Sequence, residues 1–339
     1  MKLKPQRNLI RILLDTNIWR YLVDSGYENK LFQITRRSNI HISVSPAIVI
    51  ETLRMSDLQT RRKIIELQTR ECWDRLMPDA FLQTEDVKRE MIRTHPEWEL
   101  KPKNINLFRK WRYDWVRIKG GFWEKVRIDT DKVAEQYKRQ DNLALTQVRE
   151  QSRNVRKSVL EKGLPMVNTS SLKNWKGSRR NPMSGEEVVV DAWRIYAQVI
   201  WGNMLSQDTV MKQWLGCEID IDFLLSYGAI EFIDFWESEV RLENVPREWI
   251  RASIYGIQSE RKVTDGNPTD SAIAIHAVDV DLIISADRNF VAMLNRIQDE
   301  APFKTANGIL IQAGKSGTEE LLHMLSDSTM FALSSKILH

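Results

Sequence analysis

Two short apolar runs, each followed by an aspartate, constrain the fold of this chain more than any other feature. The first is Arg11-Ile-Leu-Leu14, which Asp15 follows directly, and the second is Leu282-Ile-Ile-Ser285, which leads into Ala286-Asp287. Short apolar runs bounded by polar residues are typical of buried strands in a parallel sheet. Because the two runs lie near opposite ends of 339 residues, a sheet that contains both must draw on both ends of the chain.

The segments around these runs alternate between strand and helix patterns. Asp15-Thr-Asn17 has the composition of a turn and helix cap, and Ser45-Pro46 marks another helix start. We expect further strands over residues 41–44 and 308–312, and a strand or a helix over 229–235. Helices are expected over residues 18–23, 31–37, 47–55, 246–258, 290–297 and 318–325, with one more opening at 267. This alternation predicts an α/β fold with a parallel sheet.

The middle of the chain lacks this alternation. Helix-like spacing of apolar residues runs over 58–72, 131–162 and 185–205, and a basic loop rich in turn-forming residues is expected over 173–182. We therefore predict one α/β domain that a large, mostly α-helical insertion interrupts. The predicted parts are residues 1–57, the insertion 58–227 and residues 228–339.

Four carboxylates are expected at one edge of this sheet. Ligands of open parallel sheets bind beyond the carboxyl ends of the strands, where Asp15 and Asp287 fall. Asp270 lies in the first turn of its helix, and Glu51 lies in the helix after the second strand. If the strands are neighbours, these anions converge and need a divalent cation, and an oxygen-only ligand set favours Mg²⁺ or Mn²⁺. Two such ions, about 3.5–4 Å apart, commonly drive hydrolysis of phosphodiesters.

Each acid also has an ordinary structural interpretation. Asp15 would cap the helix that follows it, Asp270 would complement a helix dipole, and Asp287 sits in a strand-to-helix turn. A glutamate inside a helix, such as Glu51, is usually solvated. Only the four acids taken together therefore indicate a site.

Other polar residues near these motifs are not expected among the main site residues. Asp265, in the loop before its helix, is a reserve ligand, whereas Asp279 and Asp281 precede a strand and fall at the wrong end of the sheet. His276 is interpreted as a packed or surface histidine. Gly314-Lys315-Ser316 resembles the end of a phosphate-binding loop but is not one. The preceding glycine, Gly308, is one residue too far away, and the residues between form an apolar strand.

The acidic motifs resemble those of the PIN-domain nucleases. The resemblance rests on Leu14-Asp15-Thr16-Asn17, on Glu51 in a helix after a strand, on Asn267-Pro-Thr-Asp270-Ser-Ala-Ile-Ala-Ile, and on Leu282-Ile-Ile-Ser-Ala-Asp287-Arg-Asn-Phe290. It covers roughly residues 8–57 and 228–339. It implies a PIN-like three-layer α/β/α domain with a central parallel sheet.

The same resemblance implies the activity and the roles of the site residues. Asp15, Asp270 and Asp287 would hold Mg²⁺ or Mn²⁺, Glu51 would complete the pocket, and Asn17 would orient a ligand or the attacking water. The products of hydrolysis would be a 5′-phosphate and a 3′-hydroxyl. The substrate would be RNA, since most prokaryotic relatives are ribonucleases, often toxins or defence effectors.

Two features depart from the family pattern. Many members carry a further acid two residues after the last aspartate, where this chain has Asn289, so the site has one ligand fewer. Glu51 and Asp270 are 219 residues apart, far more than a compact domain of this type needs.

The charge of the chain is divided between its parts. Residues 101–180 contain 21 Lys and Arg against 8 Asp and Glu, a net charge of +13, which leaves −9 elsewhere. Cations neutralise phosphates and exposed aromatic rings stack on unpaired bases, although tryptophans can equally form the core of a helical unit. We expect the nucleic-acid contacts to come from Arg109, Lys110, Arg112, Lys173, Lys176, Arg179 and Arg180.

Composition excludes several other classes of protein. With 42% hydrophobic and 28% charged residues, the chain is neither disordered nor a multispan membrane protein. The lone Cys72 and Cys217 offer no disulfide framework and no thiolate zinc site, so both are expected to be buried. We expect a cytoplasmic protein with no membrane partner, possible self-association and a possible inhibitor protein. The alternatives are a structure-specific DNA nuclease and a non-catalytic module that binds nucleic acid or protein.

Overall fold

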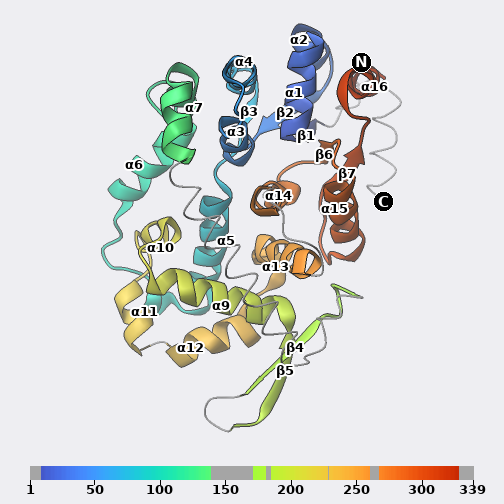
Figure 1. Cartoon of the computed structure of the whole chain (residues 1–339). Coiled ribbons are helices and arrows are strands. Elements are labelled where there is room, and N and C mark those ends of the chain that lie inside the picture. The colour runs from blue at the N-terminus through green and yellow to red at the C-terminus, as the bar shows by residue number, and fades with distance from the viewer. Residues whose placement is uncertain (1–8, 139–170, 181–184, 228, 260–266, 328–339) are drawn as a thin grey trace, which may run out of the picture.

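A parallel sheet of five strands forms the centre of the fold. The computed structural model describes residues 9–138, 171–180, 185–227, 229–259 and 267–327 (Figure 1). The strand order is β3-β2-β1-β6-β7, and every neighbouring pair is parallel. The strands are β1 (Ile10–Leu14), β2 (Ile40–Val44), β3 (Asp74–Arg75), β6 (Leu282–Ser285) and β7 (Asn307–Leu310).

The two apolar runs at opposite ends of the sequence are neighbours in this sheet. Leu14 of β1 is in register with Ile284 of β6, and the amide of Asp15 donates to the Ile284 carbonyl at 2.9 Å. The chain moves outward from β1 through β2 to β3 on one side and from β6 to β7 on the other. The boundary between β1 and β6 is therefore the topological switch point, where open α/β sheets bind ligands.

Helices from both ends of the chain surround the sheet, an arrangement compatible with a three-layer α/β/α fold. Buried apolar side chains, among them Ile18, Trp19 and Phe290, join these helices to the strands in one core. From the N-terminal part come α1 (Thr16–Ser25), α2 (Glu28–Arg37), α3 (Pro46–Leu53) and α4 (Leu58–Gln68). From the C-terminal part come α13 (Pro246–Ser259), α14 (Asn267–Ala274), the 3-10 turn η4 (Ile275–Val278), α15 (Arg288–Glu300) and α16 (Gly314–Ser326).

The middle of the chain is largely helical and lies beside this sheet in Figure 1. Its elements are α5 (Asp79–Thr94), η1 (Pro96–Trp98), α6 (Ile105–Val116), α7 (Phe122–Ile128), α9 (Ala192–Ser206), α10 (Val210–Leu215), α11 (Ile221–Tyr227), α12 (Ala229–Asp234), the π-helical turn η2 (Phe235–Glu239) and η3 (Leu242–Asn244). The predicted helix over 131–162 is described only as far as residue 138. Five of its tryptophans are more than 95% buried, namely Trp98, Trp123, Trp201, Trp214 and Trp236.

Three local predictions were wrong. Residues 176–180 of the expected basic loop form β4 (Lys176–Arg180), which pairs with β5 (Glu187–Asp191) in an antiparallel hairpin. The expected helix over 185–205 therefore begins only at Ala192. Cys72, which was expected to be buried, is exposed, whereas Cys217 is buried. Residues 229–235 are helical, one of the two alternatives that the sequence left open. The run Val188-Val-Val190 explains the hairpin, since β-branched residues favour strands and partner pairing offsets the glycine at 177.

The sheet also takes a strand from beyond residue 57, the predicted end of the first part. β3 follows α4 and pairs with β2 in the register Ser43 to Asp74 and Val44 to Arg75. The segment that completes this edge of the sheet therefore includes residues 58–75. No helix within the described ranges has the length and apolar character needed to cross a membrane.

Candidate functional site

Asp15 lies at the switch point of the sheet and caps α1. Its carboxylate accepts a hydrogen bond from the Thr16 amide at 2.7 Å, and the side chain is only 8% exposed. Burial raises the pKa of Asp15, and the nearby negative charge of Asp287 raises it further. Hydrogen bonds from Ser285, Thr16 and Asn17 oppose this rise by favouring the ionised form. Asp15 is thus both the cap that its position predicted and part of a wider polar cluster.

Asn17 connects the ends of β1 and β6. Its Nδ2 donates to Asp15 Oδ2 at 2.9 Å and to Ser285 Oγ at 3.2 Å, while its Oδ1 accepts from the Ala286 amide at 3.2 Å. The Ser285 hydroxyl donates to Asp15 as well. Donors from both strands therefore fix the direction of the Asp15 carboxylate.

Glu51 reaches the same cluster from α3. The Thr16 hydroxyl donates to its Oε2 across 35 residues of chain. Burial raises the pKa of Glu51 to about 7, the charge of Asp15 adds to the rise, and the Arg54 cation opposes it. Proline at the first turn and a Ser45 side-chain cap start α3. On this helix Glu51 is half-buried and held by Thr16, and is not a solvated surface residue.

Asp270 is the residue that interacts with all the others. Burial raises its pKa to about 7, and the charges of Asp15, Glu51 and Asp287 each raise it further. Four carboxyl groups from four elements thus repel one another at one edge of the sheet. The reserve ligand Asp265 lies outside the described residues.

Asp287 caps α15 from the turn after β6. Its Oδ1 accepts from the amides of Asn289 at 2.7 Å and Phe290 at 3.1 Å, and the residue is exposed. Asp15 and Asp287 therefore stand at the N-termini of α1 and α15. The positive ends of these two helix dipoles stabilise the carboxylates.

The donor chemistry of this cluster fits a hard divalent cation. All four groups are carboxylates, and a cation would remove the repulsion that raises the pKa values of Asp270 and Glu51. Among the described residues, however, no group of three or more His, Cys, Asp or Glu side chains is already arranged to hold a metal ion. The carboxylates would have to draw closer on binding.

Two contributors to this cluster were missed by sequence reasoning. Thr16 holds Glu51, and Arg54, at the end of α3, donates from Nη1 to Thr269 Oγ1 at 3.0 Å next to Asp270. Thr16 stands inside the Asp15-Thr-Asn17 motif, which signalled it as a polar position. Arg54 enters through tertiary packing of α3 against α14.

Asp279 and Asp281, which were expected at the wrong end of the sheet for the site, lie away from the carboxylate cluster. Asp281 Oδ2 accepts from the Arg11 amide at the start of β1, the opposite end of the sheet from Asp15. Asp279 pairs with Arg247 and lies 3.0 Å from Nδ1 of the fully buried His276.

The expected nucleic-acid contacts fall into two separate groups. Arg109, Lys110 and Arg112 lie on α6 and are exposed. Lys173 is exposed beside the β4–β5 hairpin, and Lys176 is exposed but pairs with Asp191. The backbones of Arg179 and Arg180 lie in β4, while their side chains lie outside the described residues. Figure 1 shows α6 and the hairpin at different ends of the middle segment.

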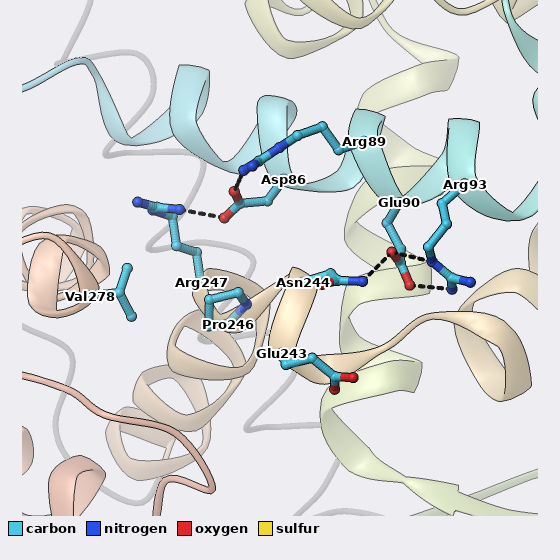
Figure 2. Close-up of a pocket in the computed structure, with 9 residues that line it drawn as sticks. All are labelled: Asp86, Arg89, Glu90, Arg93, Glu243, Asn244, Pro246, Arg247 and Val278. Carbon is cyan, nitrogen blue, oxygen red and sulfur yellow. Dashed lines mark hydrogen bonds and ion pairs between the residues drawn. The ribbon is translucent and has the colours of Figure 1, made fainter.

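A polar cavity lies between α5 and α13 and is structural in character. Its volume is about 440 Å³. Figure 2 shows the acids and arginines that pair with one another around it. Arg247 donates to both Asp86 and Asp279, and Arg93 donates to Glu90. The three anions Asp86, Asp279 and Glu90 therefore each have a cationic partner. The hydrogen bond from Arg247 of α13 to Asp86 of α5 connects the middle segment to the C-terminal part.

Comparisons of the chain with protein-family models, with curated proteins and with solved structures found no match. The site itself is therefore the basis for assigning a function.

Proposed function

We propose that this protein is a metal-dependent endoribonuclease, a PIN-like domain interrupted by a mostly helical insertion. One observation carries the proposal: four carboxyl groups from distant parts of the chain interact at the switch point of a parallel sheet. Burial of mutually repelling anions is costly unless a ligand compensates them. Functional sites are where such arrangements are found.

Each residue has a distinct role in this proposal. Asp15, Asp270 and Asp287 hold Mg²⁺ or Mn²⁺, with Glu51 completing the ligand set. When bound, such an ion activates water and neutralises charge on a phosphoryl group. Asn17 and Ser285 orient Asp15, and Thr16 orients Glu51.

The choice of RNA rests on the resemblance of the four motifs to those of PIN-domain nucleases. The same resemblance underlies the expected 5′-phosphate and 3′-hydroxyl products, and a role as a toxin or defence effector. The basic segment 101–180 would hold the substrate, since phosphate neutralisation supplies most sequence-independent affinity.

Cleavage of end-labelled single-stranded RNA, with DNA of the same sequence in parallel, tests this proposal. We expect Mg²⁺-dependent cleavage of RNA by the wild type, loss in EDTA, and loss in the Asp15→Asn/Asp287→Asn double variant. Asp281→Asn is the matched control, because Asp281 is an aspartate at the opposite end of the same sheet.

The outcomes separate the alternatives. Preferential cleavage of DNA would identify a DNA nuclease on this scaffold. Binding without cleavage at any metal concentration would identify a non-catalytic module. Activity that survives EDTA or the double variant would overturn the mechanism.

A further inference from the structure

A second cavity, of about 410 Å³, lies between α6, α7 and α10, away from the carboxylate cluster. Its size is in the range that suits small organic groups. Figure 1 shows these three helices along one side of the molecule. The sequence of this stretch mixes cations with aromatic residues, a pattern that does not by itself predict a cavity.

The walls of the cavity are aromatic. They include Trp111, Trp115, Phe122, Tyr137 and Trp214. Trp111 and Trp115 are one turn apart on α6 and share a face of that helix. The rings of Trp115 and Phe122 are 4.6 Å apart between centroids, so one wall is already assembled.

These tryptophans differ from those of the core. Every side chain of α6 is half-buried or exposed, whereas Trp123 of α7 is fully buried. The indole of Trp123 donates to the Trp115 carbonyl at 2.8 Å, which fixes α6 against α7. Trp111 and Trp115 therefore keep part of their ring surface available to a ligand.

A pair of glycines shapes the turn between the two helices. Gly120 has φ of +73°, in the left-handed region. A Cβ at Gly121 would lie 2.4 Å from the Asp114 carbonyl oxygen and 2.7 Å from Arg117 Cγ. The turn thus brings Arg117 to the cavity wall through a contact that only glycine permits.

The charge around the cavity selects the sign of the ligand. Arg117 and the exposed Lys125 line it, and Asp114 pairs with Arg117. Three further exposed cations lie on α6, and the exposed Lys119 follows it, although none of these four lines the cavity itself. This environment favours an apolar ring that carries anionic groups and disfavours a cationic ligand.

We propose that this cavity binds one unpaired base of a single-stranded nucleic acid, with the flanking phosphates on the cations of α6 and on Lys125. Stacking on aromatic rings combined with a basic groove is the usual means of holding single strands. The cavity is connected to the proposed active site through packed helices, since α7 packs on α4 and α4 packs on α3, which carries Glu51. This inference rests on the proposed function in one respect, which is that the bound strand is taken to be the substrate of the nuclease.

Binding of fluorescent RNA oligonucleotides to the full-length protein in EDTA tests this site without cleavage. We expect a single strand of about 12 nucleotides, within the site sizes of single-strand binders, to bind more tightly than a duplex of the same length. A strand of the same length whose nucleotides carry no bases should bind roughly 5- to 150-fold more weakly than the intact strand. This range corresponds to the loss of one stacked base. The Trp115→Ala variant should bind the intact strand more weakly by a similar factor. For the abasic strand, its affinity should differ little from that of the wild type.

Tyr255→Ala is the control, because Tyr255 is an exposed aromatic of α13 that is not among the cavity-lining residues. It should bind as the wild type does. Equal affinity for intact and abasic strands would overturn the proposal without needing any variant. So would a free mononucleotide that binds as tightly as the strand, which would assign the cavity to a small molecule.

This experiment separates the failure of the two proposals. Abasic-sensitive binding without Mg²⁺-dependent cleavage would leave the base-binding site standing and remove the nuclease. Mg²⁺-dependent cleavage together with equal affinity for intact and abasic strands would leave the nuclease standing and remove the base-binding site.

Discussion

The Ser285 hydroxyl donates a hydrogen bond to Asp15, although 270 residues separate the two in the chain. Its Oγ also accepts from the Asp287 amide at 2.9 Å. One serine therefore links the carboxylate after β1 to the turn that carries the carboxylate after β6. The spacing of the two predicted metal ligands depends on this link.

Ser285→Ala should lower Mg²⁺-dependent cleavage about 10- to 100-fold, the range seen when a group that orients a metal ligand is removed. Ser43→Ala is the control, because Ser43 is also a fully buried strand serine but its hydroxyl has no partner among the described residues. Rates under single-turnover conditions report the effect. Equal losses in both variants would mean that packing, and not the hydrogen bond, matters.

Thr16→Val should move the pH dependence of cleavage upward by roughly one unit. The Thr16 hydrogen bond lowers the pKa of Glu51, so its loss leaves the carboxyl protonated to higher pH. Thr16→Ser retains the hydroxyl and should keep the wild-type profile. A valine variant that lost activity equally at every pH would assign Thr16 a purely steric role.

Mg²⁺ binding should weaken as the pH falls below 7, about tenfold per unit for each proton displaced. Asp270 and Glu51 have folded-state pKa values of about 7, above their ordinary values of 3.8 and 4.5. The folded protein therefore binds more protons than the unfolded chain between those values, and stability without metal should fall as the pH rises through this window. Calorimetric titration on either side of neutrality, with melting curves, measures both effects. A pH-independent affinity would contradict the site.

Arg247→Ala should destabilise the protein by about 3–5 kcal/mol, because it leaves Asp86 and Asp279 without their buried cation. Arg89→Ala removes the other partner of Asp86, but the Arg89 side chain is 69% exposed. That loss should cost less than about 1 kcal/mol. Urea unfolding compares the two variants, and equal midpoints would show that the network of Figure 2 does not join α5 to α13.

Gly121→Ala should destabilise the protein by about 1–3 kcal/mol and weaken binding of single-stranded RNA, since its Cβ meets the Asp114 carbonyl oxygen. Gly202→Ala is the matched change. Gly202 lies inside α9, and no described atom outside that helix's own backbone lies within 4 Å of where its Cβ would stand. Alanine there should therefore stabilise the protein by about 0.5–1 kcal/mol. Thermal unfolding and oligonucleotide binding measure both effects.

Much of the sheet could be predicted because its strands are short apolar runs next to turn residues. The run after Arg11 and the run ending at Ser285 were predicted as strands, and the structure confirms both. Strand β3 was missed because two residues, Asp74 and Arg75, give no periodic signal. The β4–β5 hairpin was missed because its stability comes from pairing with a partner strand, which composition does not reveal.

The candidate site was only partly predictable for a similar reason. The positions of Asp15 and Asp287 follow from the strands that precede them. Thr16 and Arg54 enter the cluster through the packing of α1, α3 and α14, which depends on three-dimensional contacts. The same holds for Trp111 and Trp115, whose role as core or ligand-facing residues could not be decided from spacing.

The pairing of β1 with β6 has a consequence for synthesis of the protein. Strand β1 (Ile10–Leu14) leaves the ribosome well before β6 (Leu282–Ser285), the strand that covers one of its edges. Until then that edge of β1 remains without its native partner, and long-range pairing of this kind is slow to form. The carboxylate cluster cannot exist on a nascent chain that still lacks Asp270 and Asp287. The proposed nuclease would therefore stay inactive towards the message and the ribosome that are producing it at least until Asp287 has been translated.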